Sequence, residues 1–283
     1  MITIKNEFLT AQFNEVGAEL RSLASNDREY IWEGKKEVWA NACPIMFPIC
    51  GGLKNDKYIF EGKEYILEKH GYVRNLVFEV ESKTEDSVVF LHKSSAETRV
   101  KFPFDYELRV IYTLEEKTLK IDYSVINKTD KTMYFNIGSH EGYATPEGIE
   151  DYDIVFPEQE TLSTGVLYGN LLSQQTMPII KDQNYLPLYE KYFTIDALVF
   201  TDLKSRSATL RNRKNGRGVR VDFPDAHYFL LWHKPNAPYM CVEPWNGVQD
   251  IVGSSYEITE KEGITALDSG KEFLYTHSIT IIE

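Results

Sequence analysis

The sequence predicts an all-β protein whose strands form a large β-sandwich or barrel-like double sheet. Apolar and polar residues alternate with a period of two along much of the chain, as expected for strands with one buried face. No window carries an apolar stripe at i, i+3, i+4 and i+7 beyond a turn or two, so only a few short helices are expected. The 18 tyrosines and 15 phenylalanines also favour strands over helices.

The clearest strands form a hairpin in the middle of the chain. Alternating apolar residues run from 106 to 114 and from 119 to 125, on either side of a polar turn, and predict a long antiparallel hairpin. Further strands are predicted at 9–13, 88–91, 197–200, 219–223, 228–232 and 273–282, the last of which is expected to close the sheet. Residues 146–191 are rich in polar and turn residues and predict a large excursion. No linker or repeat divides the chain, so residues 1–283 are treated as one domain.

Composition narrows the class of protein. The chain has 31 Lys and Arg against 43 Asp and Glu, so its formal net charge is −12, which argues against nucleic acid and membrane surfaces as partners. No segment approaches the ~20 apolar residues of a membrane span, and the N-terminus lacks the pattern of a signal peptide. The three cysteines, Cys43, Cys50 and Cys241, form no CxxC pair. These features predict a soluble, cytoplasmic protein with reduced thiols.

Three segments place polar residues in apolar or Gly- and Pro-rich surroundings. They are 44–54 with 70–74, then 134–143, and finally 238–247. His70 precedes a glycine and His140 follows Gly138 by two residues, so both are expected at tight turns that expose an imidazole. Glu243 follows an apolar stretch, and Pro244 is expected to end that strand at once. A carboxylate at such a strand end is well placed to project into a cleft.

Taken one at a time, these residues are more often structural than catalytic. Together, two histidines and a glutamate can either bind zinc or form a metal-free acid/base set. The chain has no HExxH or comparable close ligand pair, so nothing in the sequence favours a metal. It also has no GxSxG elbow and no phosphate-cradling GxxxxGK[ST] loop. The residues alone therefore leave both a zinc site and a metal-free acid/base set open.

The ordered segments resemble the aldose 1-epimerase (galactose mutarotase-like) family, and most of all its bacterial LacX-type branch. The motifs His70-Gly-Tyr-x-Arg74 and Cys241-x-Glu-Pro-Trp245 carry the resemblance, which extends from 17–20 to 262–264. It implies an antiparallel supersandwich with a sugar-binding cleft across one sheet. It also implies cofactor-free interconversion of the α and β anomers of an aldose, so that the partner is a small-molecule sugar. The sequence does not define the oligomeric state.

The resemblance assigns roles to particular residues. Glu243 matches the general base that takes the proton from the anomeric hydroxyl, and His140 matches the general acid that protonates the ring oxygen. His70 matches the histidine that hydrogen-bonds the sugar, and Asp196 matches a sugar-binding aspartate. Trp245 can offer an apolar face to the sugar, as can Trp232 and Tyr72, although core packing is the interpretation favoured for Trp232.

One departure from the family pattern bears on substrate choice. Gly52 stands where the family commonly has an arginine that contacts the sugar, and Lys54 is the nearby residue that can supply the missing charge. Three alternatives to an epimerase that acts on a free hexose stay open. A hexose 6-phosphate requires a cationic cluster, for which the candidates are Arg74, Lys54 and Lys57. A catalytically idle sugar-binding protein is favoured by Gly52. A glycoside hydrolase requires a second carboxylate, for which the only candidate is Glu141.

Overall fold

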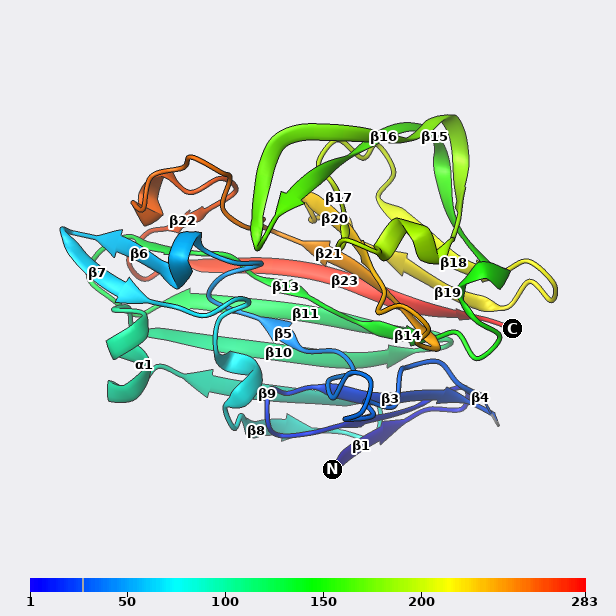
Figure 1. The fold of residues 1–283 in the computed structure, drawn as a ribbon. Coiled ribbons are helices and arrows are strands. Elements are labelled where there is room, and N and C mark those ends of the chain that lie inside the picture. Colours follow the sequence, from blue (N-terminus) through cyan, green and yellow to red (C-terminus); the bar gives the residue numbers. More distant parts are fainter. Residues whose placement is uncertain (27) are drawn as a thin grey trace.

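The computed structural model describes residues 1–26 and 28–283, and its architecture is built from antiparallel sheets packed face to face (Figure 1). The larger sheet has the order β16 (Leu171–Pro187), β15 (Tyr152–Tyr168), β18 (Ser207–Asn212), β19 (Gly218–Asp222), β23 (Glu272–Ile282), β11 (Thr118–Asn127), β10 (Tyr106–Glu115), β9 (Ser87–Lys93) and β8 (Glu79–Lys83). The smaller sheet has the order β17 (Leu198–Phe200), β20 (Tyr228–Trp232), β21 (Tyr239–Trp245), β13 (Gly138–Ser139) and β5 (Ile45–Met46), with β14 (Gly142–Ala144) also paired to β21.

Shorter elements surround the two sheets. An N-terminal sheet joins β1 (Ile2–Lys5), β2 (Thr10–Phe13), β3 (Leu20–Ser25) and β4 (Arg28–Glu29). Two ribbons pair β6 (Lys57–Phe60) with β7 (Lys63–Ile66), and β12 (Met133–Phe135) with β22 (Thr265–Leu267). The helices are short: α1 (Ala96–Lys101) and 3₁₀ turns at Lys54–Asp56, Val73–Asn75, Ile149–Asp151, Glu190–Phe193 and Ile258–Glu260. No helix within residues 1–26 and 28–283 is long and apolar enough to cross a membrane.

The predicted central hairpin is confirmed. Strands β10 and β11 pair in register from Tyr106 opposite Asn127 to Glu115 opposite Thr118. Alternate residues of β10 are buried, because one face of the hairpin packs into the core and the other faces solvent. The strands predicted at 9–13, 88–91, 197–200, 219–223 and 228–232 also correspond to strands of the structure.

The C-terminal strand does not close the sheet. It lies in the middle of the larger sheet, where β23 pairs with β19 on one side and with β11 on the other. Its buried residues alternate through Tyr275, His277, Ile279 and Ile281, so the strand joins two halves of the core. Position in the chain is a poor guide to position in a sheet, because long connections return late strands to its centre.

The excursion predicted for the polar region 146–191 consists mainly of a long hairpin. Strands β15 and β16 pair with several register shifts and reach their turn at Gly169 and Asn170. Figure 1 shows this green hairpin arching over β17, β20 and β21. Much of β16 is exposed on both faces, so the sequence lacks the alternation that marks a half-buried strand.

Pro244 does not end its strand. It lies within β21 opposite Phe229 of β20. On the other edge, the N–H of Val242 donates to Glu141 and the N–H of Asn246 donates to Ile137. Pro244 falls between these two bonds, where the pairing passes from β14 to β13, so its missing N–H costs no ladder hydrogen bond there.

The two faces of β21 have different surroundings. Met240 and Val242 belong to the large hydrophobic core between the sheets, while Glu243 and Trp245 line a cavity on the opposite face. The Tyr275 hydroxyl of the larger sheet donates to the Pro244 carbonyl at 2.9 Å, which ties β21 to the core behind it. Strand β21, which forms one wall of the cavity, is therefore held against the core.

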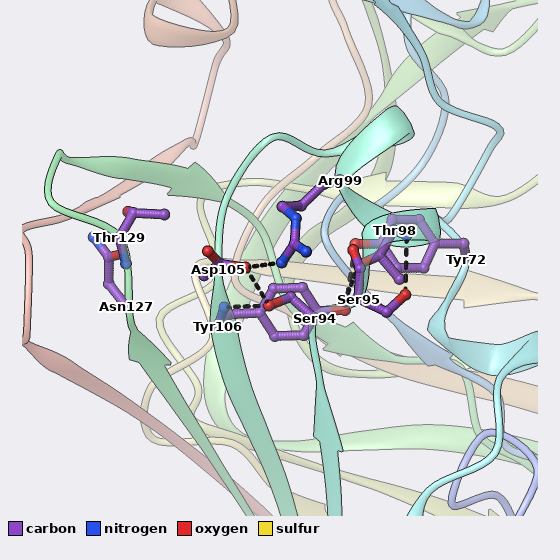
Figure 2. Close-up of polar contacts among 9 residues, drawn as sticks. All are labelled: Tyr72, Ser94, Ser95, Thr98, Arg99, Asp105, Tyr106, Asn127 and Thr129. Carbon is purple, nitrogen blue, oxygen red and sulfur yellow. Dashed lines mark hydrogen bonds and ion pairs between the residues drawn. The ribbon is translucent and has the colours of Figure 1, made fainter.

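The segment that carries His70 contacts β10 directly, next to the short helix α1 that precedes this strand. The helix begins with a capping box in which Ser95 and Thr98 exchange side-chain and backbone hydrogen bonds (Figure 2). At its other end, Arg99 pairs with Asp105. Next to Asp105, the hydroxyl of Tyr106 lies 3.3 Å from the hydroxyl of Tyr72, two residues after His70. Residues far apart in the sequence are thus fixed on one side of the site.

Candidate active site

A cavity of about 540 Å³ lies on the outer face of the smaller sheet, within the range of small-molecule sites. Its walls come from the loops before β5 and after β7, the segment 193–197, and the tip of the β15–β16 hairpin. The predicted site residues that line it are His70, Arg74, His140, Asp196, Glu243 and Trp245. The structure therefore gathers six of the seven predicted site residues around one cavity.

Glu243 and His140 meet in this cavity. Glu243 comes from β21 and is 1% exposed, while His140 lies in the irregular stretch between β13 and β14. The Glu243 Oε2 atom is 3.4 Å from the His140 Nδ1 atom, and both atoms are buried with no hydrogen-bond partner within the described part of the chain. The contact is longer than a good hydrogen bond and leaves both groups free to engage a ligand.

Burial governs the charge of this pair. Removal from water raises the pKa of Glu243 well above its ordinary value, and the nearby Glu141 carboxylate raises it further. Burial also lowers the pKa of His140 to about 3, with a smaller contribution from Lys69. Both shifts favour the neutral forms, a carboxylic acid and a neutral imidazole, which together hold one exchangeable proton. One exchangeable proton shared between two side chains is the least that coupled acid and base catalysis requires.

His70 is held by its backbone in a left-handed turn, with φ of 68°. A Cβ at the next residue, Gly71, would lie 2.1 Å from the Phe47 carbonyl oxygen, so only glycine fits there. The N–H of Gly51 donates to the His70 Nδ1 atom at 3.2 Å, which in a neutral ring leaves the proton on Nε2. Burial lowers the pKa of His70 well below its ordinary value, so the ring is a neutral donor. Its imidazole is buried, not exposed as predicted.

Charged residues lie along another part of the wall. The Asp196 carboxylate accepts a hydrogen bond from the Ala197 N–H at 2.8 Å and lies 4.0 Å from the Lys69 Nζ atom. The Arg74 guanidinium donates to the Lys69 carbonyl at 3.0 Å and has no carboxylate within 4 Å among the described residues. Partial burial lowers the pKa of Arg74. Lys69 was not predicted, although it immediately precedes His70.

Aromatic rings complete the wall. Trp39 lies over His140 with ring centroids 5.0 Å apart, and Trp232 meets His140 edge to face at 5.4 Å. The Trp245 indole donates to the Ser139 carbonyl at 3.0 Å. Trp232 packs against a buried cluster that includes Trp32 and Tyr239, as predicted, but it also lines the cavity. Trp39 was missed, since it lies in a polar loop with no pattern that marks it.

The structure does not bring Lys54 to the cavity. Its ammonium group lies 4.5 Å from the centre of the Tyr256 ring and donates to the Ser254 carbonyl. Lys57 pairs with Glu64 on the surface. Neither lysine therefore replaces the charge of an arginine at position 52, and the space beside Gly52 is occupied by Asn170 of the hairpin tip.

Glu141 does not supply a second carboxylate to the cavity. It is buried and hydrogen-bonds to His277 at 2.8 Å and to Ser139 at 2.7 Å, and it is not among the lining residues. This placement rules out Glu141 as the second carboxylate of a glycoside hydrolase at this cavity.

One set of side chains has the composition of a metal site. Donor atoms of His140, Cys241 and Glu243 lie within 4.8 Å of one another. Burial raises the pKa of the Cys241 thiol well above its ordinary value, and a metal ligand must be the thiolate. In their neutral forms Cys241 and Glu243 keep their protons and are poor metal ligands, whereas the neutral imidazole of His140 is the form that binds a metal. Cys43, Cys50 and Cys241 are all buried and unpaired.

Comparison with known proteins agrees with this geometry. A sequence profile of the aldose 1-epimerase family matches residues 1–262. The chain belongs to the aldose 1-epimerase family. Membership implies an isomerase-type enzyme with a sugar as its small-molecule partner. The resemblance drawn from the motifs is confirmed, and so is the predicted antiparallel β-sandwich.

Relatives within the family match over the whole chain. The plasmid and chromosomal LacX proteins of Lactococcus lactis subsp. lactis are each 37% identical over 299 residues, covering 99% of this chain and 99% of theirs. A galactose mutarotase related enzyme from Lactobacillus acidophilus has a TM-score of 0.94 at 34% identity, covering 100% of this chain and 97% of its own. A galactose mutarotase-like protein from Lactobacillus casei has a TM-score of 0.94 at 30% identity, with 100% of both chains covered.

Proposed function

We propose that this epimerase-family protein interconverts the α and β anomers of a free hexose without a metal or other cofactor. Glu243 acts as the general base at the anomeric hydroxyl, and His140 acts as the general acid at the ring oxygen. The observation that carries the proposal is the 3.4 Å approach of Glu243 Oε2 to His140 Nδ1 inside a cavity of sugar-binding size, where neither atom has a hydrogen-bond partner among the described residues. A base and an acid so placed can serve the two oxygens on one anomeric carbon.

The reaction conserves the single proton of the pair. Binding of the sugar moves the proton from Glu243 to His140, because hydroxyl groups that donate to Glu243 stabilise its carboxylate. Glu243 takes the proton from O1 as the C1–O5 bond breaks, and His140 gives its proton to O5. The C1–C2 bond then rotates, and the reverse transfers close the ring on the other face. The pair ends with the same one proton, so no other acid or base is consumed.

Other cavity residues bind and orient the sugar. The Nε2–H of His70 donates to a sugar oxygen, since Nδ1 already accepts from Gly51. Asp196 accepts from sugar hydroxyls, and Trp39, Trp232 and Trp245 offer apolar surface to the C–H groups of the ring. The buried, unpaired cysteines suit a reducing compartment, so we place this activity in the cytoplasm.

The test follows anomer interconversion of freshly dissolved α-glucose and α-galactose by polarimetry or NMR exchange. Glu243→Gln keeps the shape of the side chain and removes the base, and it is expected to slow turnover by about 10²–10⁴-fold. Sugar binding, measured by calorimetry, should persist. Glu7→Gln, at an exposed position, is the matched control. Full activity in Glu243→Gln would rule out Glu243 as the base, and sugar binding without acceleration by the wild type would identify an idle binding protein.

A phosphorylated hexose is the second candidate substrate. It is favoured by Arg74, a cavity guanidinium whose carboxylate partner is missing among the described residues. Arg74→Ala should then raise KM for glucose 6-phosphate far more than KM for glucose. Equal increases for the two sugars would count against a phosphate at this position.

A further inference from the structure

Gln249 is a cavity residue that the proposed reaction does not use. It lies in the segment after β21 and lines the same cavity as Glu243 and His70. The residue is 4% exposed, and its Oε1 atom is buried without a hydrogen-bond partner in the part of the chain that the structure describes. A buried carboxamide that is left unpaired costs free energy, so its persistence in a ligand cavity points to a ligand.

The backbone around Gln249 is firmly positioned. The next residue, Asp250, forms a buried ion pair with Lys261 at 3.2 Å, and the Lys261 ammonium also donates to the Val248 carbonyl at 2.5 Å. The N–H of Asp250 donates to the Gly52 carbonyl at 2.9 Å. Bonds on both sides of Gln249 therefore hold it against the loop that contains Gly51 and Gly52.

Two glycines allow the amide groups to reach the cavity. A Cβ at Gly51 would lie 2.5 Å from the Gln249 Cβ atom, and a Cβ at Gly52 would lie 2.8 Å from the Asn170 Cβ atom. Gln249 and Asn170 thus pack against adjacent residues of one loop, and both line the cavity. Gly51 also donates to His70, so this pair of amides lies at the His70 end of the site.

We propose that Gln249, together with Asn170 at the hairpin tip, forms a neutral amide subsite that binds a hydroxyl group of the sugar. A carboxamide offers both a donor and an acceptor, and a hydroxyl needs one of each. The subsite selects for a hydroxyl at one ring position, because a sugar that lacks it leaves the buried Gln249 oxygen unpaired. This proposal rests on the proposed function only for the class of ligand. It concerns binding and does not require turnover.

The test compares ligands as well as variants. Binding of a hexose and of its 2-, 3-, 4- and 6-deoxy analogues is measured by calorimetry with the wild type, Gln249→Ala and Gln249→Met. The methionine variant keeps the side-chain volume and guards against a folding defect of the alanine variant. Gln183→Ala, at an exposed position of β16 outside the cavity, is the matched control.

We expect both Gln249 variants to bind the parent hexose about 3- to 10-fold more weakly than the wild type does. For one deoxy analogue, and only one, the variants and the wild type should bind with equal affinity, because that analogue lacks the hydroxyl group to which Gln249 binds. Asn170→Ala should weaken the parent hexose less, since Asn170 is exposed.

Equal weakening for every analogue would indicate a general packing defect and would overturn the subsite, as would unchanged binding of the parent hexose. Failure of the proposed function gives a different result. A wild type that binds hexoses with this selectivity but does not accelerate their interconversion refutes the epimerase and leaves the subsite standing. A wild type that binds none of these sugars overturns both.

Discussion

The substitution Gly52→Ala tests whether the hairpin tip is a fixed wall of the site. Gly52 has ordinary backbone angles, so alanine brings no backbone strain there. Its Cβ would lie 2.8 Å from the Asn170 Cβ atom and 3.3 Å from the Asn170 carbonyl oxygen. Carbon atoms prefer separations of about 3.5–4.0 Å, so the tip must move outwards by roughly an ångström.

The tip is not free to make that movement. The N–H of Leu172 donates to the Asp250 carbonyl at 2.8 Å, and the N–H of Val252 donates to the Leu172 carbonyl at 2.8 Å. Leu172 is also buried in the small hydrophobic cluster that includes Trp245. Overpacking of this kind costs about 1–3 kcal/mol, and each kcal/mol lowers Tm by about 2–4 °C in a chain of this size.

The assay combines calorimetric unfolding with kcat/KM for anomer interconversion. Gly52→Ala should lower both Tm and kcat/KM, and Asn170→Gly in the same chain should restore most of Tm by removing the opposing Cβ. Gly62→Ala provides a comparison at which a Cβ meets nothing within 4 Å, although its φ of 75° adds backbone strain of its own. If Gly52→Ala matches the wild type in both measurements, the tip is loosely held and does not define the cavity.

Three further predictions follow from the site. Because burial lowers the pKa of His140 to about 3, the imidazole of the free enzyme does not titrate between pH 7 and pH 5, and kcat/KM should stay level as the pH falls through that range. A decline centred near pH 6.5 would instead reveal a solvated imidazole. Exhaustive chelation should leave the rate unchanged, and a loss restored by zinc would refute the metal-free mechanism. Trp39→Ala should raise KM by about 2- to 10-fold, whereas Trp39→Phe should recover most of the affinity, and identical values for the two variants would exclude ring stacking.

The sequence predicts the fold best where one face of a strand is buried. Strands β10 and β11 are evident because their alternate residues enter the core. The β15–β16 hairpin is not, since much of β16 is solvated on both faces and carries no alternation. The central place of β23 depends on its pairing with distant strands, which no local pattern records.

Some residues of the candidate site can likewise be predicted from the sequence, and others cannot. The motifs that match the family predict His70, His140 and Glu243 as members of one site, and the structure brings all three to one cavity. Pro244 lies inside a regular strand, so it is no marker of that site. Lys69, Trp39 and Gln249 come from loops whose place beside the cavity is set by tertiary contacts alone. Lys54 shows the opposite failure: it is close to Gly52 in sequence, but its side chain lies over Tyr256.

The cavity and the core behind it are electrostatically linked through the residues that flank His140. Glu141 links this segment to the larger sheet through a hydrogen bond to His277 of β23 at 2.8 Å. The Ser139 hydroxyl donates to the same Glu141 side chain at 2.7 Å. Buried polar groups of this kind add little net stability compared with a well-packed apolar core, so their value here lies in position and charge. They fix the peptide that carries His140, and the Glu141 carboxylate raises the pKa of Glu243 on the cavity side. Replacing Ser139 and Glu141 by apolar residues would preserve a core. It would also release His140, the proposed acid, and remove one of the causes that raise the pKa of Glu243, the proposed base.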